Sequence, residues 1–130
     1  MIKNKEKIEL EYLINTTPGI LFNRLSTPSG LSEWFAEDVS VKGNIFTFRW
    51  SNSEQLAEQT LRKENKMVRY TWIEDEDLEN VWFELSINIE ELTGDVALII
   101  IDHVDKDEVK DTTNLWNRQV EILKQGLGSS

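Results

Sequence analysis

The side chains that could do chemistry are few, and most are carboxylates. His103 is the one histidine of the chain, so any catalytic triad that needs an imidazole would depend on it. It directly follows Asp102, and neighbouring residues of a strand point to opposite faces of a sheet, so the two are poorly placed to act as a pair. Asp102 would share a face with Leu98 and Ile100, where burial would raise its pKa, but the sequence favours a solvated strand end.

A run of acidic residues, Glu74-Asp75-Glu76-Asp77-Leu78-Glu79, is a second candidate, because hard cations bind carboxylate oxygens. It lacks the spacing and the central glycine of an EF-hand loop, so we predict a charged hairpin end and no metal site. The sequence has no cysteine, no Gly-rich phosphate loop, no nucleophile elbow and no dinucleotide fingerprint. We therefore expect no cofactor and no catalytic residue. Enzymatic activity of a cyclase or hydratase kind, through Asp102 or Tyr70, is kept as a minority alternative.

Composition restricts the partners and the cellular compartment that we expect for the protein. The 130 residues include 24 acidic and 14 basic ones, a formal net charge of −10 that repels nucleic acid and anionic membrane surfaces. The longest apolar run, from Val96 to Ile101, is far shorter than the roughly 20 residues that span a bilayer. Without cysteines or a targeting signal, we expect one cytoplasmic domain over residues 1–130, with a frayed tail at 127–130. The sequence does not indicate an oligomeric state.

Alternating apolar and polar residues, the period of a half-buried strand, recur along most of the chain. They begin at Ile8 to Ile14 and continue from Val39 to His103, with a turn signal at Gly43-Asn44. The segment from Gln55 to Arg62 is the most polar of these strands, whereas Val96 to Ile101 is apolar enough to be buried on both faces. These patterns predict about six to seven antiparallel strands.

Helix signals occur at two places. Thr17-Pro18 and Thr27-Pro28 each combine a capping residue with proline at the first helical position, which predicts two short helices back to back after the first strand. Asp111 to Thr113 offer caps for a final helix that ends at Gly126 to Gly128. Its roughly 22 Å approach the roughly 23 Å of a seven-residue strand, so one helix can lie across the whole sheet.

This order of elements resembles the helix-grip fold. The segment from Thr27 to Val39, which includes Trp34-Phe35-Ala36, resembles the signature of START-like (SRPBCC) proteins related to the activator of the heat-shock-ninety ATPase. Further similar positions lie along almost the whole chain: Gly43, Phe46, Phe48, Trp50, Tyr70-Thr71-Trp72 and Trp116. The resemblance implies an α+β fold in which a curved antiparallel sheet grips a long C-terminal helix and leaves a cavity between them.

The leading functional prediction is a non-enzymatic domain that binds a small apolar or amphipathic ligand in that cavity. The alternative, in which the same aromatic residues fill a packed core, is equally favoured by the sequence. The residues expected to line the cavity are Phe48, Trp50, Tyr70, Trp72, Phe83, Leu85, Leu115, Trp116, Gln119 and Ile122.

A protein-interaction module of the co-chaperone type is the competing hypothesis, with Trp34 and Phe35 as its partner surface. The excess negative charge lies entirely in residues 67–130, and eight of its ten charges lie within the acidic run and the stretch from Asp102 to Asp111. In an antiparallel sheet both segments lie at one end, which the resemblance makes the mouth of the cavity. We therefore expect an acidic rim that disfavours anions and favours neutral or cationic ligands or a basic partner: Glu74, Asp75, Glu76, Asp77, Asp102 and Asp105.

Overall fold

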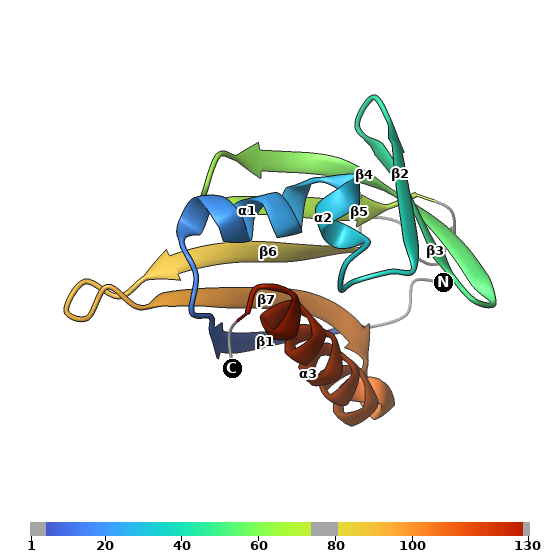
Figure 1. Cartoon of the computed structure of the whole chain (residues 1–130). Helices are drawn as coiled ribbons and strands as arrows, with labels where there is room; N and C mark the ends of the chain where they lie inside the picture. The colour runs from blue at the N-terminus through green and yellow to red at the C-terminus, as the bar shows by residue number, and fades with distance from the viewer. Residues whose placement is uncertain (1–4, 74–80, 129–130) are drawn as a thin grey trace.

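One curved antiparallel sheet carries three helices on the same face (Figure 1). The computed structural model describes residues 5–73 and 81–128. The strands are β1 (Lys5–Leu13), β2 (Asp38–Lys42), β3 (Ile45–Trp50), β4 (Ser53–Lys63), β5 (Met67–Trp72), β6 (Trp82–Ile89) and β7 (Val96–Asp105). The helices are α1 (Pro18–Ser26), α2 (Pro28–Leu31) and α3 (Val109–Gly126), and a short 3-10 turn, η2 (Lys106–Glu108), precedes α3.

The seven strands follow the order β1-β7-β6-β5-β4-β3-β2, so the first strand pairs with the last. All neighbouring strands are antiparallel. The ribbons of β2 and β3 cross those of β6 and β7 at a steep angle in Figure 1, which shows the strong curvature of the sheet. The predicted α+β helix-grip architecture, with two short helices after the first strand and a long C-terminal helix, is confirmed.

The two short helices begin at the predicted caps. The Thr17 Oγ1 accepts a hydrogen bond from the Ile20 amide at 3.3 Å, and the Thr27 Oγ1 accepts one from the Gly30 amide at 3.0 Å. Gly30 fits where α2 turns against the end of α1, because a Cβ there would lie 2.2 Å from the carbonyl oxygen of Asn23. The helix pair is therefore held by capping hydrogen bonds and one very close backbone contact.

Two strands are longer than the sequence pattern indicates. The polar strand β4 has 11 residues and changes register between Gln59 and Leu61, which interrupts its alternation. β7 runs beyond the apolar segment as far as Asp105, because β1 pairs with it along its whole length, up to the Lys5–Asp105 pair. Pairing with β1 thus extends β7 into polar residues. Local periodicity does not predict this long-range contact.

The core lies between the sheet and the helices. Phe48, Tyr70 and Leu85 are fully buried on the inner face. The Tyr70 hydroxyl donates to the Leu25 carbonyl at 2.7 Å and so ties the centre of the sheet to α1. On the outer face, Arg69 makes two hydrogen bonds to Glu84 Oε1 at 2.9 and 3.1 Å, between directly paired strand positions.

Candidate functional site

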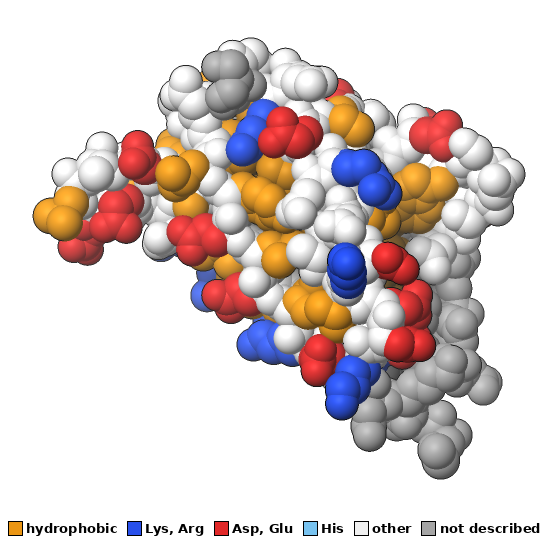
Figure 2. Space-filling model, turned by 90° about the horizontal axis from the view of Figure 1, so that it is seen from below, with side chains coloured by type: hydrophobic (Ala, Val, Ile, Leu, Met, Phe, Trp, Pro, Cys, Tyr) orange, Lys and Arg blue, Asp and Glu red, His pale blue; other side chains and the backbone are white. Residues whose placement is uncertain are grey.

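An aromatic pocket of about 360 Å³ lies between α3 and one end of the sheet. Its strand residues come from the end of β3, the start of β4, the end of β5, the start of β6 and the second half of β7. Figure 2 views the molecule from below and shows a recessed hydrophobic area toward the side of the β3–β4 hairpin, with acidic side chains near it. The lining residues are Phe35, Trp50, Gln55, Trp72, Phe83, Asp102, Thr112, Leu115, Trp116 and Gln119.

Phe35 sets the inner limit of this pocket. It belongs to the segment between α2 and β2 and enters the space between the sheet and α3, where its side chain is buried. Its ring is stacked on Phe83 and on Trp116, with centroid distances of 5.2 and 5.6 Å, and it meets Phe48 edge-on at 5.0 Å. The ring thus closes the deep part of the space between sheet and helix and leaves open the part near the strand ends.

Asp102 is the one ionisable side chain in the lining of the pocket, among the residues that the structure describes. The Trp116 Nε1 donates to its Oδ2 at 2.9 Å, and the His103 amide donates to its Oδ1 at 2.8 Å. Burial raises the pKa of Asp102 above its usual range, although these two hydrogen bonds and the charges of His103 and Lys5 oppose the shift. The inward orientation is therefore found, and the solvated strand end that the sequence favoured is wrong.

Three hydrogen-bond donors of the pocket lining are used within the protein. The Trp50 Nε1 and the Gln119 Nε2 both donate to the Phe35 carbonyl, at 3.1 and 2.9 Å, and the Trp116 Nε1 donates to Asp102. Carboxylate and amide oxygens have two lone-pair directions each, so Asp102 and Gln119 keep free accepting capacity. The lining thus offers acceptors at Asp102 and Gln119 beside the amide and hydroxyl groups of Gln55 and Thr112.

Six of the ten side chains expected in the cavity line this pocket: Trp50, Trp72, Phe83, Leu115, Trp116 and Gln119. Phe48, Tyr70 and Leu85 are instead fully buried; Phe48 packs on Phe35, and the Tyr70 hydroxyl donates to Leu25 of α1. Ile122 lies in a neighbouring shallow groove between α3 and residues 32–37. The aromatic residues of the prediction thus divide between a packed core and the lining of the pocket at its edge.

Trp34 and Phe35 do not form an exposed partner surface. They are only 4% and 6% exposed, and the Trp34 Nε1 donates to the Arg24 carbonyl at 2.9 Å. The expectation of a partner surface at these residues is wrong, because α2 turns the segment toward the core rather than toward solvent.

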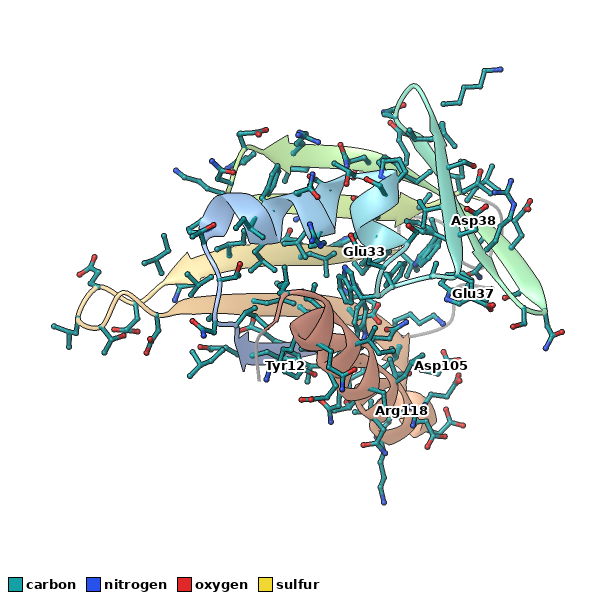
Figure 3. The ribbon with its side chains drawn as sticks, in the orientation of Figure 1. Tyr12, Glu33, Glu37, Asp38, Asp105 and Arg118 are labelled. Atoms are coloured by element: carbon teal, nitrogen blue, oxygen red, sulfur yellow. The ribbon has the colours of Figure 1, made fainter. Side chains whose placement is uncertain are left out.

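The expected acidic rim is only partly within the described residues. Glu74, Asp75, Glu76 and Asp77 lie outside them. Asp102 is in the pocket wall rather than at a solvated rim, and Asp105, at the end of β7, forms a salt bridge with Lys5 at 3.0 Å. Figure 3 places Glu37, Asp38 and Asp105 toward the same end of the molecule, so further carboxylates lie at this end.

His103 points away from the pocket, as its position next to Asp102 predicts. Its Nδ1 lies 2.8 Å from the Trp82 carbonyl oxygen, and its ring meets the Trp82 ring at 4.5 Å. Within residues 5–73 and 81–128, no group of three or more histidine, cysteine or acidic side chains could hold a metal ion. The described helices include none that is long and apolar enough to cross a membrane.

The curved sheet, the gripped helix and the pocket between them define an α+β helix-grip domain of the ligand-binding or interaction type. The model of the START-like superfamily domain matches residues 2–129, and the chain belongs to this superfamily. No curated protein matches the chain.

Among solved structures, BfR322 from Bacteroides fragilis is 36% identical to this chain, with a TM-score of 0.66, and the match covers 95% of this chain and 92% of that one. The Aha1 dimer from Colwellia psychrerythraea is 19% identical, with a TM-score of 0.79 and coverage of 94% and 96%. CalU16 from Micromonospora echinospora is 10% identical, with a TM-score of 0.72 and coverage of 95% and 74%. At identities this low, the last two show a shared fold alone.

Sequence reasoning missed Phe35, Gln55 and Thr112 as lining residues, and it favoured a solvated strand end for Asp102. Thr112 precedes Leu115 and Trp116 by three and four positions, which is the spacing of one helix face. Its place in the lining could therefore be predicted from the sequence. Gln55 lies two positions before Ala57, which is fully buried, and therefore also shares an inner face. The inward turn of Phe35 depends on how α2 packs, for which the sequence carries no local signal.

Proposed function

We propose that this domain is a non-enzymatic binder of a small apolar or amphipathic molecule, which it holds in the pocket between α3 and the strand ends. The observation that carries the proposal is the pocket itself, about 360 Å³ with five aromatic rings in its lining. This volume is at the lower end of the roughly 300–1,000 Å³ typical of small-molecule sites. Aromatic walls with a few polar groups are the usual composition of such sites.

The competing hypotheses have less support. The interaction module of co-chaperone type relied on Trp34 and Phe35, which are buried. An enzyme that uses Asp102 together with Tyr70 needs both at one site, but Tyr70 is fully buried in the core and its hydroxyl is engaged with the Leu25 carbonyl. Asp102 alone offers a proton donor or acceptor without a second titratable group in the described lining.

Binding can be tested with 2-phenylethanol, a neutral probe small enough for the pocket. We expect it to perturb the indole N–H resonances of Trp50, Trp72 and Trp116 in an NMR titration more than those of Trp34 and Trp82. Solvent extraction of the purified protein followed by mass spectrometry would show whether a molecule is retained from the cell. Absence of both binding and any retained molecule would rule out the proposal.

A variant that fills the pocket provides the specific control. Thr112→Phe places a ring in the lining, while Asn114→Phe adds the same ring at an exposed position of α3 outside the lining. We expect the first variant to abolish binding of 2-phenylethanol and the second to leave it unchanged. Equal loss in both variants would assign the effect to α3 as a whole rather than to the pocket.

A further inference from the structure

The described lining of the pocket combines aromatic walls with one half-buried carboxylate, a pairing that selects for one sign of charge. Trp50, Trp72 and Trp116 all line it, and indole is the aromatic group that interacts most strongly with cations. Asp102 contributes the one ionisable group of the described lining, and that group is acidic. Both features act in the same direction, because a ring face and a carboxylate each attract positive charge.

The carboxylate has no ion-pair partner among the described residues. Lys5, whose charge acts on Asp102, forms its salt bridge with Asp105 instead. His103 also acts on it, but its ring is on the opposite face of β7 and lies against the Trp82 carbonyl. Asp102 therefore accepts hydrogen bonds from two neutral N–H donors and has no salt bridge among the described residues.

A half-buried carboxylate without an ion pair gains more from a cation than a fully exposed one does, because partial burial weakens its hydration. Each oxygen of Asp102 accepts one hydrogen bond from the protein and keeps a second lone pair. An ammonium group can donate to these oxygens while its charge offsets that of the carboxylate. A carboxylate ligand would meet like charge at Asp102.

From these contacts we infer that the preferred ligand of the pocket is a small organic cation, a protonated amine on an apolar or aromatic body, with its ammonium group at Asp102. The body would lie among the rings of Trp50, Trp72 and Trp116. This inference rests on the proposed ligand-binding function and specifies the chemical class of its ligand. It excludes free fatty acids and other organic anions as preferred ligands.

Three probes that share a phenylethyl body test the assignment on the intact chain: 2-phenylethylammonium, 2-phenylethanol and 3-phenylpropanoate. We expect the ammonium to bind at least about ten-fold more tightly than the alcohol, a ratio equivalent to about 1.4 kcal/mol, and the propanoate to bind least. Dissociation constants from calorimetry or NMR titration give the ratio. Equal binding of ammonium and alcohol, or tightest binding of the propanoate, would overturn the inference while leaving the proposed function intact. Failure of all three to bind would overturn both.

The net charge of −10 attracts any cation at long range, and this contribution must be separated from that of Asp102. Raised salt screens exposed charges more than buried ones, so the ratio of ammonium to alcohol affinity should survive at high ionic strength. A ratio that falls to one in salt would assign the preference to general attraction and would overturn the inference.

Asp102→Asn removes the pocket charge and should bring the ammonium-to-alcohol ratio close to one. Asp95→Asn removes the same charge from an exposed position in the turn before β7, at the other end of the sheet, and should leave the ratio unchanged. An unchanged ratio in Asp102→Asn, or an equal fall in both variants, would contradict the assignment. The ranking of the three probes on the unmodified chain remains decisive if Asp102→Asn does not fold.

Discussion

The indole nitrogen of Trp116 donates a hydrogen bond to the half-buried carboxylate of Asp102 over 2.9 Å. This contact joins α3 to β7 and places an acidic group on the wall of an otherwise aromatic pocket. It fixes the orientation of the carboxylate and leaves the protein with a charge that burial destabilises. The stability of the fold should therefore depend on the ionisation of Asp102.

The first prediction concerns the pH dependence of stability. Burial raises the pKa of Asp102, so the folded state holds its proton to a higher pH than the unfolded chain does. Below the ordinary aspartate pKa both states are protonated and the group costs nothing. As the pH rises toward the raised pKa, the unfolded chain releases the proton first, and the folded state loses stability until the folded carboxylate also ionises.

Asp102→Asn cannot titrate and should escape this loss. Urea unfolding between about pH 4 and pH 7 should show the variant gaining stability relative to the unmodified protein as the pH rises. Asp95→Asn, an exposed change of equal charge, should show a smaller trend. A flat difference for Asp102→Asn, or one that favours the unmodified protein at higher pH, would mean that the carboxylate is solvated in solution.

A second prediction concerns the Tyr70 hydroxyl. Tyr70→Phe keeps the ring but leaves the buried Leu25 carbonyl without the hydrogen bond that it accepts at 2.7 Å. We expect a loss of about 1–2 kcal/mol in the free energy of unfolding, because a buried acceptor loses its partner. Urea denaturation measures the loss.

Tyr12→Phe is the matched control for that change. The Tyr12 hydroxyl donates to Asn117 on the exposed side of α3, where water can replace it, so the cost should be smaller. An equal or larger loss for Tyr12→Phe would contradict the assigned role of burial.

A third prediction concerns the contact between α1 and α2. A Cβ at Gly30 would lie 2.2 Å from the Asn23 carbonyl oxygen and 2.7 Å from the Arg24 Cα, and backbone atoms cannot give way easily. Gly30→Ala should cost about 1–3 kcal/mol or more in unfolding free energy.

The comparison variant for Gly30→Ala is Gly19→Ala. The nearest atom to a Cβ at Gly19 is the Asn65 Oδ1 at 3.9 Å, so nothing obstructs the new methyl group. It should raise the melting temperature, because alanine is favoured over glycine in a helix by about 0.5–1 kcal/mol. Destabilisation by both variants would refute the contact explanation.

Much of the fold could be predicted from the sequence because the patterns that mark its helices and strands are local. Threonine-proline pairs mark the starts of α1 and α2, and alternation marks the strands. Trp72, Phe83 and Trp116 could be placed on the pocket side by the same periodicities. Periodicity does not predict how deeply a residue is buried. Tyr70 and Trp72 share a face of the sheet, but Tyr70 is fully buried and Trp72 borders the pocket.

Tyr70 lies against α1, where its hydroxyl donates to the Leu25 carbonyl, whereas Trp72 borders the pocket. Phe35, which lies far away in sequence, packs on Phe48 and Phe83 and so takes up the space between this core and the pocket. Asp102 was misplaced for a related reason, since its burial depends on Trp116 reaching across from α3. Both are tertiary effects that outweigh the local preference of an acidic residue for solvent.

The last prediction tests this role of Phe35. Phe35→Leu removes the stacking on Phe83 and Trp116, which contributes about 0.5–1.5 kcal/mol beyond burial. It also shortens the side chain that limits the pocket, so the free space should extend inward. We expect lower stability together with tighter binding of a larger neutral probe, 2-(2-naphthyl)ethanol, relative to 2-phenylethanol.

Phe22→Leu separates the two effects. Phe22 is equally buried but lies on α1 and is absent from the pocket lining, so its substitution should lower stability without changing the ratio of affinities. Calorimetric titration of both variants with both alcohols gives that ratio directly. If Phe35→Leu lowers stability and leaves the preference for the smaller alcohol intact, another residue sets the depth of the pocket. A shift toward the larger alcohol in Phe35→Leu alone would establish that one ring divides the space between sheet and helix into core and pocket.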